Sequence, residues 1–405
     1  MRIAFLSIHG YVDPVPNPGL TDTGGQVVYV LEMAKKLGEE NVSVDIFTRR
    51  FGGRKELEPV ARNVRIIRIP CGPPRFVPKE KLYLYLEEYA RNFLRYIEMV
   101  GLKYDIIHSH YWDAGFVALI AREELGVPMF HTSHSLGLLK KIMLGDIGKK
   151  VEYGFDVRIE TERKILRMAD KLVSASPIEP EYVTRYYGIV REFDIIPPGV
   201  DIRFFNPKTK NIDIDVPKIY VFTTGRIEWT KGFDLLVKAF GKAVKYLGDV
   251  KLLIGGGSLS PSKLEKEIRD RISRLSRGLG ISDKVVQLGR IPNDLLPAYY
   301  AKSRVVVLPS RYDLFGMVAI EALACGRPVI VSKYAGVHKL IRDDFGYIVD
   351  PLDEEDLAEK IILLVRDRYR ADRMGHRGRM YVEKNLTWKK LALDLKAIYE
   401  NFLGQ

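Results

Sequence analysis

Residues 219–232 read IYVFTTGRIEWTKG, a run of β-branched and aromatic residues followed at once by glycine, charged residues and a second glycine. The first six residues carry no charge or turn former, which is typical of a strand buried on both faces of a parallel sheet. A helical pattern starts just beyond Gly232. The stretch therefore predicts a strand, a loop and a helix of the kind that builds α/β folds.

The same strand-and-helix unit recurs along the chain. Helical patterns lie between the predicted strands, for example at 25–37, 79–100, 114–125 and 157–168. Such alternation predicts doubly wound parallel sheets. The predicted strands are 3–8, 42–48, 64–69, 105–108, 128–132 and 171–175, and then 219–224, 251–254, 285–288, 305–308, 329–331 and 347–349.

The alternation pauses once, at Ile195-Ile196-Pro197-Pro198-Gly199-Val200, and restarts at Ile219. A chain of 405 residues is also longer than one ordinary domain of roughly 100 to 200 residues. We therefore predict two α/β domains, residues 1–198 and 199–385, with a hinge within 195–217.

Composition narrows the class of protein. The chain has 64 Lys and Arg against 52 Asp and Glu, a net charge of +12. This excess favours an anionic partner, but without zinc-finger spacing or an RNP-like aromatic strand we expect no nucleic acid. No apolar run reaches the roughly 18 residues of a membrane span, and the N-terminus shows no secretory pattern. With only Cys71 and Cys325, we expect a cytoplasmic protein without disulfides.

Ligands of doubly wound sheets bind beyond the carboxyl ends of the strands, so residues that follow strands are site candidates. After the first strand come His9-Gly10, a proline-rich loop, and Asp22-Thr23-Gly24-Gly25-Gln26 at the start of a helix. The two glycines allow close approach of a ligand, and free helical N–H groups favour an oxyanion. A tight turn with positive φ explains the glycines equally well.

Four of the seven histidines, His108, His110, His131 and His134, fall at the ends of two neighbouring strands. Histidines that merely cap a core would be scattered, so this concentration predicts a functional role for at least one of them. Metal ligation is the alternative, although no carboxylate stands at a fixed short spacing to complete a metal motif.

In the second half of the chain, cations and acids follow the strands. Arg226 and Lys231 flank the expected start of a helix near Gly232, which suits a diphosphate; a surface ion pair is the alternative. Asp313 follows the strand 305–308, and Glu321 lies inside an apolar helix, where a carboxylate needs a partner. That partner is either a hydroxyl-rich ligand, such as ribose or a sugar ring, or a nearby arginine.

Together these residues resemble the retaining, nucleotide-sugar-dependent glycosyltransferases of family 4, which include sucrose synthases and sucrose-phosphate synthases. Residues 24–30 are similar to the family's acceptor-side glycine loop, Gly225-Arg226 with Lys231-Gly232 to its diphosphate clamp, and 313–321 to its paired-acid motif. The resemblance spans the chain. It implies the GT-B fold, in which two Rossmann-like domains face each other and the last helix, within 386–405, crosses back to the first domain.

The resemblance implies a role for each position. Arg226 and Lys231 would stabilise the leaving diphosphate, and Glu321 would hold the nucleotide ribose. Asp313 would contact the hydroxyls of the donor sugar, and His134, in a His-Ser motif, would lie beside the transferred sugar. The other expected donor-site residues are Gly25, Phe315 and Gly316.

Similarity to sucrose-phosphate synthases extends to the acceptor side. Gly25 and Gln26 would contact the acceptor, and Lys79, Lys140 and Arg158 stand where those enzymes hold the phosphate of fructose 6-phosphate. The alternative is that Lys79 and Arg158 are ordinary helix-surface residues.

The expected reaction is transfer of a hexose from a UDP or ADP carrier to a phosphorylated sugar, and glucose is the hexose that the resemblance favours. No metal or other cofactor is expected, because protein cations replace the metal in this fold. Family members usually carry Glu at the position of Asp313, so the resemblance leaves the identity of the donor sugar open. The alternatives are a mannosyltransferase acting on a lipid or another sugar, bound peripherally to a membrane, and a non-catalytic nucleotide-sugar-binding homologue. The oligomeric state stays open.

Overall fold

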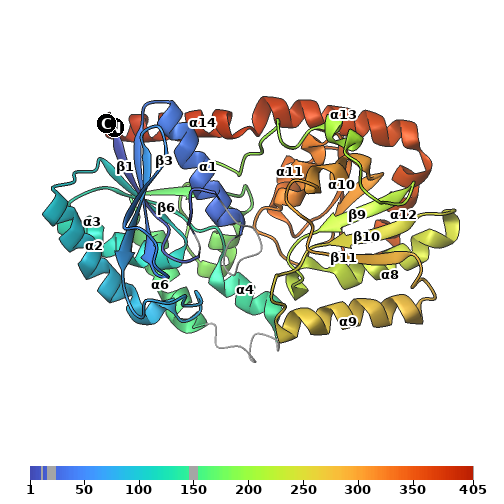
Figure 1. Cartoon of the computed structure of the whole chain (residues 1–405), viewed down its shortest axis with the longest axis horizontal. Helices are drawn as coiled ribbons and strands as arrows, with labels where there is room; N and C mark the ends of the chain where they lie inside the picture. Colours follow the sequence, from blue (N-terminus) through green and yellow to red (C-terminus); the bar gives the residue numbers. More distant parts are fainter. Residues whose placement is uncertain (11, 16–23, 146–153, 405) are drawn as a thin grey trace. The chain divides into compact units, whose positions relative to one another are not determined.

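The computed structural model describes residues 1–10, 12–15, 24–145 and 154–404. Asp22, Thr23 and most of the proline-rich loop lie outside these ranges. The chain divides into two compact units: unit 1 is Met1–Pro198 with Trp388–Gln405, and unit 2 is Gly199–Thr387. Each unit is built on one sheet flanked by helices (Figure 1), so the prediction of two Rossmann-like domains is confirmed.

The sheet of unit 1 has the order β3-β4-β2-β1-β5-β6-β7-β8, and only the β3–β4 pair is antiparallel. All six predicted strands are present. Two were not predicted: β3, whose residues are mostly exposed, and β8, which has only two residues. The strands are β1 (Arg2–Leu6), β2 (Ser43–Arg50), β3 (Leu57–Ala61), β4 (Val64–Pro70), β5 (Ile106–His110), β6 (Met129–Thr132), β7 (Lys171–Ser174) and β8 (Asp194–Ile195).

The last helix of the chain, α14 (Trp388–Leu403), belongs to unit 1, as the resemblance implied. It lies beside α1 (Figure 1). Its Tyr399 hydroxyl is 2.5 Å from His108 Nδ1, and the rings of Phe402 and Phe130 lie 5.1 Å apart. The other helices of unit 1 within the described residues are α1 (Gly25–Glu39), α2 (Leu86–Val100), α3 (Trp112–Leu125), α4 (Gly137–Leu144), α6 (Phe155–Met168) and α7 (Glu179–Tyr182).

The sheet of unit 2 is parallel throughout, in the order β11-β10-β9-β12-β13-β14. Its strands are β9 (Tyr220–Thr224), β10 (Lys251–Gly255), β11 (Val285–Gly289), β12 (Val305–Leu308), β13 (Val329–Ser332) and β14 (Gly346–Val349). Its helices are α8 (Phe233–Ala243), α9 (Lys263–Gly278), α10 (Leu296–Lys302), α11 (Met317–Ala324), α12 (Glu354–Arg366) and α13 (Arg368–Asn385). No helix in the described part of the chain is long and apolar enough to span a bilayer.

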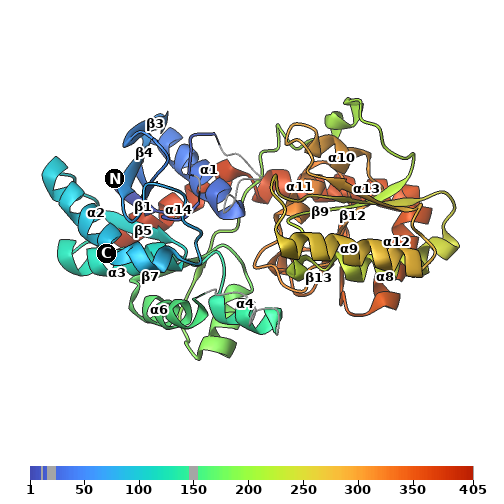
Figure 2. The same ribbon diagram turned by 60° about the horizontal axis from the view of Figure 1, so that its bottom comes forward.

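Alternate residues of the unit 2 strands enter two hydrophobic cores. In β9, Val221 packs into the core that contains α8 and α12, whereas Tyr220 and Phe222 pack into the core that contains α10 and α11. Figure 2 shows α8 and α9 together on one side of these strands. Because both faces are covered, the strands read as unbroken apolar runs in the sequence.

The strand order reverses once in each sheet. In unit 1 the reversal lies between β1 and β5, and in unit 2 between β9 and β12. Ligands of doubly wound sheets bind beyond the carboxyl ends of the strands at such a point. The loops that follow these four strands are therefore the places to search for a site.

Candidate active site

Two glycines allow the loops of unit 2 to meet at the carboxyl edge of its sheet. Gly232 has φ 68°, and a Cβ there would stand 2.1 Å from the carbonyl oxygen of Pro309. Gly256 has φ 122°, and its Cβ would stand 1.8 Å from the carbonyl oxygen of Gly225. Side chains cannot approach a carbonyl so closely, so both positions require glycine. The loops after β9, β10 and β12 are thus in direct contact.

Lys231 and Asp313 form an ion pair between two of these loops. The Nζ–Oδ2 distance is 2.5 Å, and the side chains are 17% and 19% exposed. The backbone of Asp313 is held on both sides, because its N–H donates to the carbonyl of Tyr334 and its carbonyl accepts from the N–H of Gly336. The structure therefore brings together Lys231, which is predicted to bind the diphosphate, and Asp313, which is predicted to bind the sugar.

A second ion pair, between Asp234 and Arg311, joins the same two parts of the chain as the first. Arg311 donates to both carboxylate oxygens of Asp234, at 2.7 and 2.8 Å, and its guanidinium lies 3.8 Å from the ring centroid of Trp229. Burial acts to raise the pKa of Asp234, but hydrogen bonds and charges from Arg311 and Arg271 lower it overall. This cluster fixes the 229–234 segment to the loop that carries Asp313.

Arg226 differs from Lys231 in its surroundings. Its side chain is 63% exposed and pairs with Glu228 at 2.9 Å. The surface-ion-pair alternative therefore describes Arg226 but not Lys231. The helix α8 begins directly after Gly232, as predicted.

The apolar helix α11 begins after Gly316, which has φ 108°, and carries Glu321 in its second turn. Its Oε2 accepts a hydrogen bond of 2.7 Å from the Tyr300 hydroxyl, so the protein partner is a tyrosine rather than the arginine that was considered. Burial raises the pKa of Glu321 to about 7, against the opposing effect of that bond. Phe315, just before the helix, is buried, and its carbonyl accepts from the N–H of Val337.

In unit 1, the glycine loop leads into α1 without a strained turn. Gly24 has φ −125°, so the alternative of a turn with positive φ is wrong for this residue. Gly25 is exposed at the first position of α1. The Gln26 amide donates to Ser7 Oγ at 3.3 Å and to the carbonyl of His110 at 3.2 Å. Gln26 thus joins the ends of β1 and β5, where the strand order reverses.

Two of the four clustered histidines are bonded inside the core. His108 Nε2 lies 2.9 Å from Thr132 Oγ1, and His131 Nδ1 lies 2.8 Å from Ser109 Oγ. Burial lowers the pKa of His131 to about 3, so this ring is neutral near pH 7. For these two, the role of polar groups within a core is sufficient.

His134 is distinguished by its backbone. It has φ 54°, a left-handed conformation that is uncommon for residues other than glycine and costs about 1 to 3 kcal/mol. Its Nε2 lies 3.0 Å from His110 Nδ1, and burial lowers its pKa to about 3. Among the described residues, no group of three potential ligands could hold a metal ion. His134 is therefore a neutral imidazole held at a strained position on the carboxyl edge.

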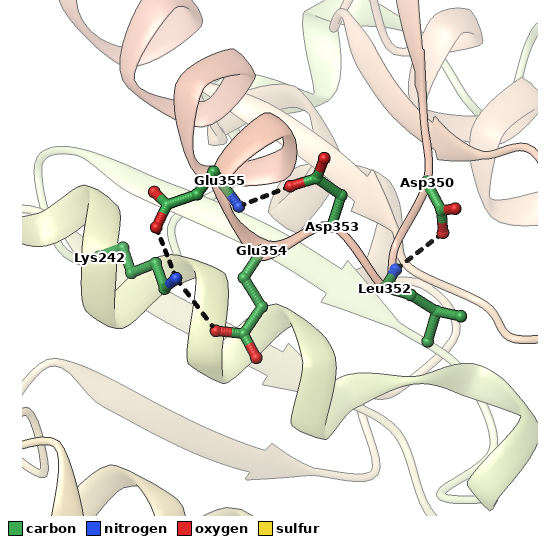
Figure 3. Close-up of a pocket in the computed structure, with 6 residues that line it drawn as sticks. All are labelled: Lys242, Asp350, Leu352, Asp353, Glu354 and Glu355. Carbon is green, nitrogen blue, oxygen red and sulfur yellow. Dashed lines mark hydrogen bonds and ion pairs between the residues drawn. The ribbon is translucent and has the colours of Figure 1, made fainter.

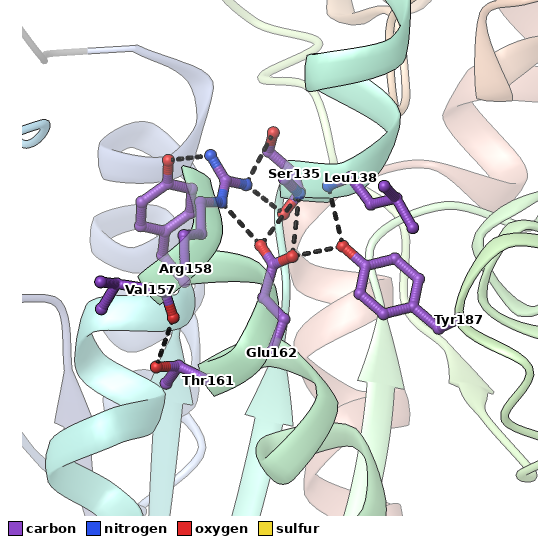
Figure 4. Close-up of polar contacts among 9 residues, drawn as sticks. Ser135, Leu138, Val157, Arg158, Thr161, Glu162 and Tyr187 are labelled. Atoms are coloured by element: carbon purple, nitrogen blue, oxygen red, sulfur yellow. Dashed lines mark hydrogen bonds and ion pairs between the residues drawn. The ribbon is translucent and has the colours of Figure 1, made fainter. Parts of the chain in front are cut away.

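Arg158 is the centre of a buried polar network (Figure 4). Its side chain is 4% exposed, so the helix-surface alternative is wrong for this residue. It donates to Glu162 at 2.7 Å, to the Tyr111 hydroxyl at 2.7 Å and to the Ser135 carbonyl at 2.9 Å. Glu162 also accepts from the N–H of Gly137, the first residue of α4. The pair therefore fixes the start of the helix that carries Lys140.

Tyr111 is bonded by Arg158 and is also affected by the charge of Lys79. It follows β5 with φ 82°, a second strained residue at this edge. Burial raises the pKa of its hydroxyl, and the positive charges of Arg158 and Lys79 oppose that rise. Lys79 is 18% exposed and lies in a turn before α2 rather than on a helix. The Tyr111 hydroxyl is thus bonded by Arg158 and lies within the electrostatic influence of Lys79, and Lys140 is half-buried in the adjoining α4.

Sequence reasoning missed several residues of these edges, including Tyr111, the Asp234–Arg311 pair and Glu179. Glu179 is fully buried, and burial raises its pKa to about 7. Its Oε2 accepts from Ser174 Oγ at 2.5 Å, while its buried Oε1 has no hydrogen-bond partner among the described residues. The sequence did offer a signal for Glu179, because this acid stands shortly after the predicted strand 171–175, five residues beyond Ser174.

Two family models match the chain: Glycosyltransferase Family 4 over residues 23–204 and Glycosyl transferases group 1 over residues 205–381. The mannosylfructose-phosphate synthase of Agrobacterium fabrum is 36% identical over 98% of this chain and 91% of its own length. The chain belongs to glycosyltransferase family 4. The resemblance drawn from the sequence is therefore confirmed.

Two further relatives of this glycosyltransferase extend the comparison. The D-inositol 3-phosphate glycosyltransferase of Salinispora tropica is 33% identical over 98% of this chain and 85% of its own length. The solved structure of sucrose-phosphate synthase from Thermosynechococcus elongatus matches with a TM-score of 0.88 and 31% identity, covering 100% of this chain and 99% of that one. The GT-B fold is thereby established.

A hollow of about 530 Å³ lies elsewhere on unit 2 of the glycosyltransferase (Figure 3). Asp350, Asp353, Glu354 and Glu355 line it, with Lys242 as the lining cation. Lys242 contacts Glu355 at 2.6 Å and Glu354 at 3.4 Å. This acidic surface lies after β14 and would repel a diphosphate, so it does not suit a diphosphate ligand.

The raised pKa of Glu321 predicts a pH-dependent stability for the ligand-free glycosyltransferase. Between the ordinary pKa of 4.5 and about 7, the folded state binds more protons than the unfolded chain. The contribution of Glu321 to the free energy of unfolding is therefore most favourable at low pH. It becomes less favourable as pH rises towards 7, by roughly 3 kcal/mol in total. Glu321→Gln should remove this loss.

The measurement is chemical denaturation of wild type and Glu321→Gln at pH 5 and pH 8. The variant should gain stability relative to wild type as pH rises. Glu267→Gln, on the exposed face of α9, is the matched control and should show no such gain. A difference between Glu321→Gln and wild type that is the same at both pH values would contradict the assignment.

Proposed function

We propose that this protein is a retaining glycosyltransferase that moves a hexose from a nucleotide diphosphate sugar to a phosphorylated sugar such as fructose 6-phosphate. The observation that carries the proposal is the buried Arg158, bonded to the Tyr111 hydroxyl at the carboxyl edge of unit 1, where the charge of Lys79 also acts. The names of three relatives share a phosphorylated sugar or polyol: mannosylfructose-phosphate, inositol 3-phosphate and sucrose-phosphate.

On the donor side, Lys231 is the main candidate for charge stabilisation. As the bond to the anomeric carbon breaks, negative charge grows on the leaving diphosphate, and a fixed cation lowers the barrier. Lys231 is mostly buried, next to the first turn of α8, whose free N–H groups add positive potential. The exposed Arg226 could bind the diphosphate together with Lys231 only if its ion pair with Glu228 were broken. In this mechanism the protein supplies the cations, and we expect no metal requirement.

Asp313 bears on the identity of the transferred sugar. Its carboxylate already pairs with Lys231, so it can bind sugar hydroxyls only at the side away from that contact or by sharing Lys231 with the ligand. The resemblance to sucrose-phosphate synthases favours glucose. The name of the Agrobacterium relative favours mannose, which differs from glucose only at C2. The donor sugar is thus a choice between two hexoses that one experiment can separate.

On the acceptor side, Lys79 is the more exposed of these two cations, at 18% against 4% for Arg158. Arg158 already bonds Glu162, Tyr111 and Ser135, so it contributes charge and fixes Tyr111 and α4. Lys79 contacts Glu80 at a loose 3.8 Å in a turn. A phosphate placed over Tyr111 would then meet one fixed and one adjustable cation.

The experiment that tests the function measures release of nucleoside diphosphate from UDP-, ADP- and GDP-linked glucose and mannose. Each donor is combined with fructose 6-phosphate, fructose or no acceptor, with and without EDTA. We expect release that requires fructose 6-phosphate with one of the donors and is unaffected by EDTA. Equal release with fructose, or release only without any acceptor, would refute the phosphorylated acceptor.

Replacing Lys231 should weaken the chemical step. Lys231→Ala removes a cation from the site of developing charge. The activation free energy that corresponds to kcat/KM should therefore rise by about 2 to 4 kcal/mol, and kcat/KM should fall accordingly. Because the change also leaves Asp313 without its partner, the double variant Lys231→Ala with Asp313→Asn is measured alongside. Lys245→Ala, an exposed lysine of the same unit, is the control. Near-normal turnover in Lys231→Ala would rule out the assignment.

Replacing Lys79 should affect the acceptor alone. Lys79→Ala should raise the KM for fructose 6-phosphate about ten-fold, since a charged hydrogen bond is worth roughly 1.5 kcal/mol or more. The KM for the donor should stay nearly unchanged. Lys81→Ala removes an exposed lysine two residues away and serves as the control. An equal rise for unphosphorylated fructose would show that Lys79 does not bind the phosphate.

A further inference from the structure

A cavity of about 860 Å³ lies wholly within unit 2 and has no place in the mechanism above. Seven of its lining residues are Lys or Arg, and one is an acid, Asp372. Asp213 and Asp215 belong to the same segment of chain but do not line it. The cations are Lys210, Lys218, Lys302, Arg304, Arg327, Arg368 and Arg379.

The cavity lies at the amino edge of the unit 2 sheet. Its lining includes Lys218-Ile219 just before β9, Ser303-Arg304 just before β12, and Gly326-Arg327 before β13. The candidate donor residues follow the carboxyl ends of the same strands. Strands of four or five residues separate the two edges by roughly 15 Å, so the cavity is a different place from the donor site.

The positive charge of the cavity is only partly neutralised. Asp372 is bonded by Arg327 at 3.1 Å and by Arg368 at 3.4 Å, and its charge also acts on Arg304. One carboxylate thus serves three guanidinium groups. Arg379 is excluded from this count, because it pairs with Glu383 and donates to three backbone carbonyls.

Arg304 is the residue that most needs a ligand. Its guanidinium makes no hydrogen bond or ion pair with any part of the chain that the structure describes, although it is half-buried. Burial lowers its pKa, Asp372 opposes the effect, and the charges of Arg368 and Arg327 add to it. In addition, the buried Nε of Arg327 has no hydrogen-bond partner among the described residues. Both arginines therefore have donors that an oxyanion could satisfy.

We propose that this basic cavity binds a phosphorylated small molecule at a site separate from the nucleotide sugar. Arginine forks suit phosphate, and the volume lies within the ordinary range for small-molecule sites, roughly 300 to 1,000 Å³. Its volume of about 860 Å³ favours a compact phosphate ester or diphosphate over an extended polyanion. The inference is independent of the transferase reaction, because no donor or acceptor residue lines the cavity.

Titration calorimetry with pyrophosphate tests the proposal on the full chain at fixed ionic strength. Wild type should bind, and Arg304→Gln should lose one binding event or weaken it about ten-fold or more. Arg277→Gln, which removes an exposed arginine at the end of α9, should bind as wild type does. The candidate donor site can also bind pyrophosphate; that event should persist in Arg304→Gln and weaken in Lys231→Ala.

Three outcomes would overturn the proposal: no pyrophosphate binding by wild type, an unchanged number and strength of events in Arg304→Gln, or equal weakening in Arg277→Gln. Arg304→Gln should fold normally, because the cation it removes has no bonded partner. Its ligand-free melting temperature should equal or exceed that of wild type. If it fails to fold, Lys218→Gln, an exposed residue of the same cavity, gives the same test.

Discussion

In a parallel sheet, the carboxyl ends of all strands meet at one edge, and connections to the two faces diverge where the strand order reverses. In this protein the reversal lies between β1 and β5 in unit 1 and between β9 and β12 in unit 2. Gln26 bonds across the first reversal, and the Lys231–Asp313 pair joins the loops that border the second. This constraint, rather than any single contact, determines where chemistry can occur.

Two neighbouring ion pairs hold these candidate residues in position. Asp234–Arg311 fixes the loops that carry Lys231 and Asp313, and Arg158–Glu162 fixes Tyr111 and the start of α4. A buried ion pair gains little net stability, because desolvation offsets most of the attraction. Its geometry is nevertheless well defined when further hydrogen bonds satisfy both groups, as they do for Arg158 and Glu162. Such fixed charges stabilise a transition state without having to reorient during the reaction.

The sequence predicted the strands well because both faces of each sheet are buried, so β-branched runs such as 305–308 stand out. It failed for the edge strand β3, whose residues are largely exposed, and for the start of α2, where a short 3₁₀ turn intervenes. It placed His134, Lys231 and Asp313 at strand ends, but positive φ at His134 and Tyr111 leaves no mark in composition. Long-range partners, such as Arg311 for Asp234 and Tyr300 for Glu321, depend on tertiary packing that spacing does not encode.

Three charged or titratable groups stand apart from this pattern of pairing. Glu321 has only a tyrosine hydroxyl, Glu179 has one unbonded oxygen, and Arg304 has no bonded partner among the described residues. Each is at least partly buried, so each lowers the stability of the ligand-free chain. Packing alone would favour apolar residues at all three positions. Of the three, Arg304 lines the basic cavity of unit 2, where a ligand from outside the chain can supply the missing counter-charge.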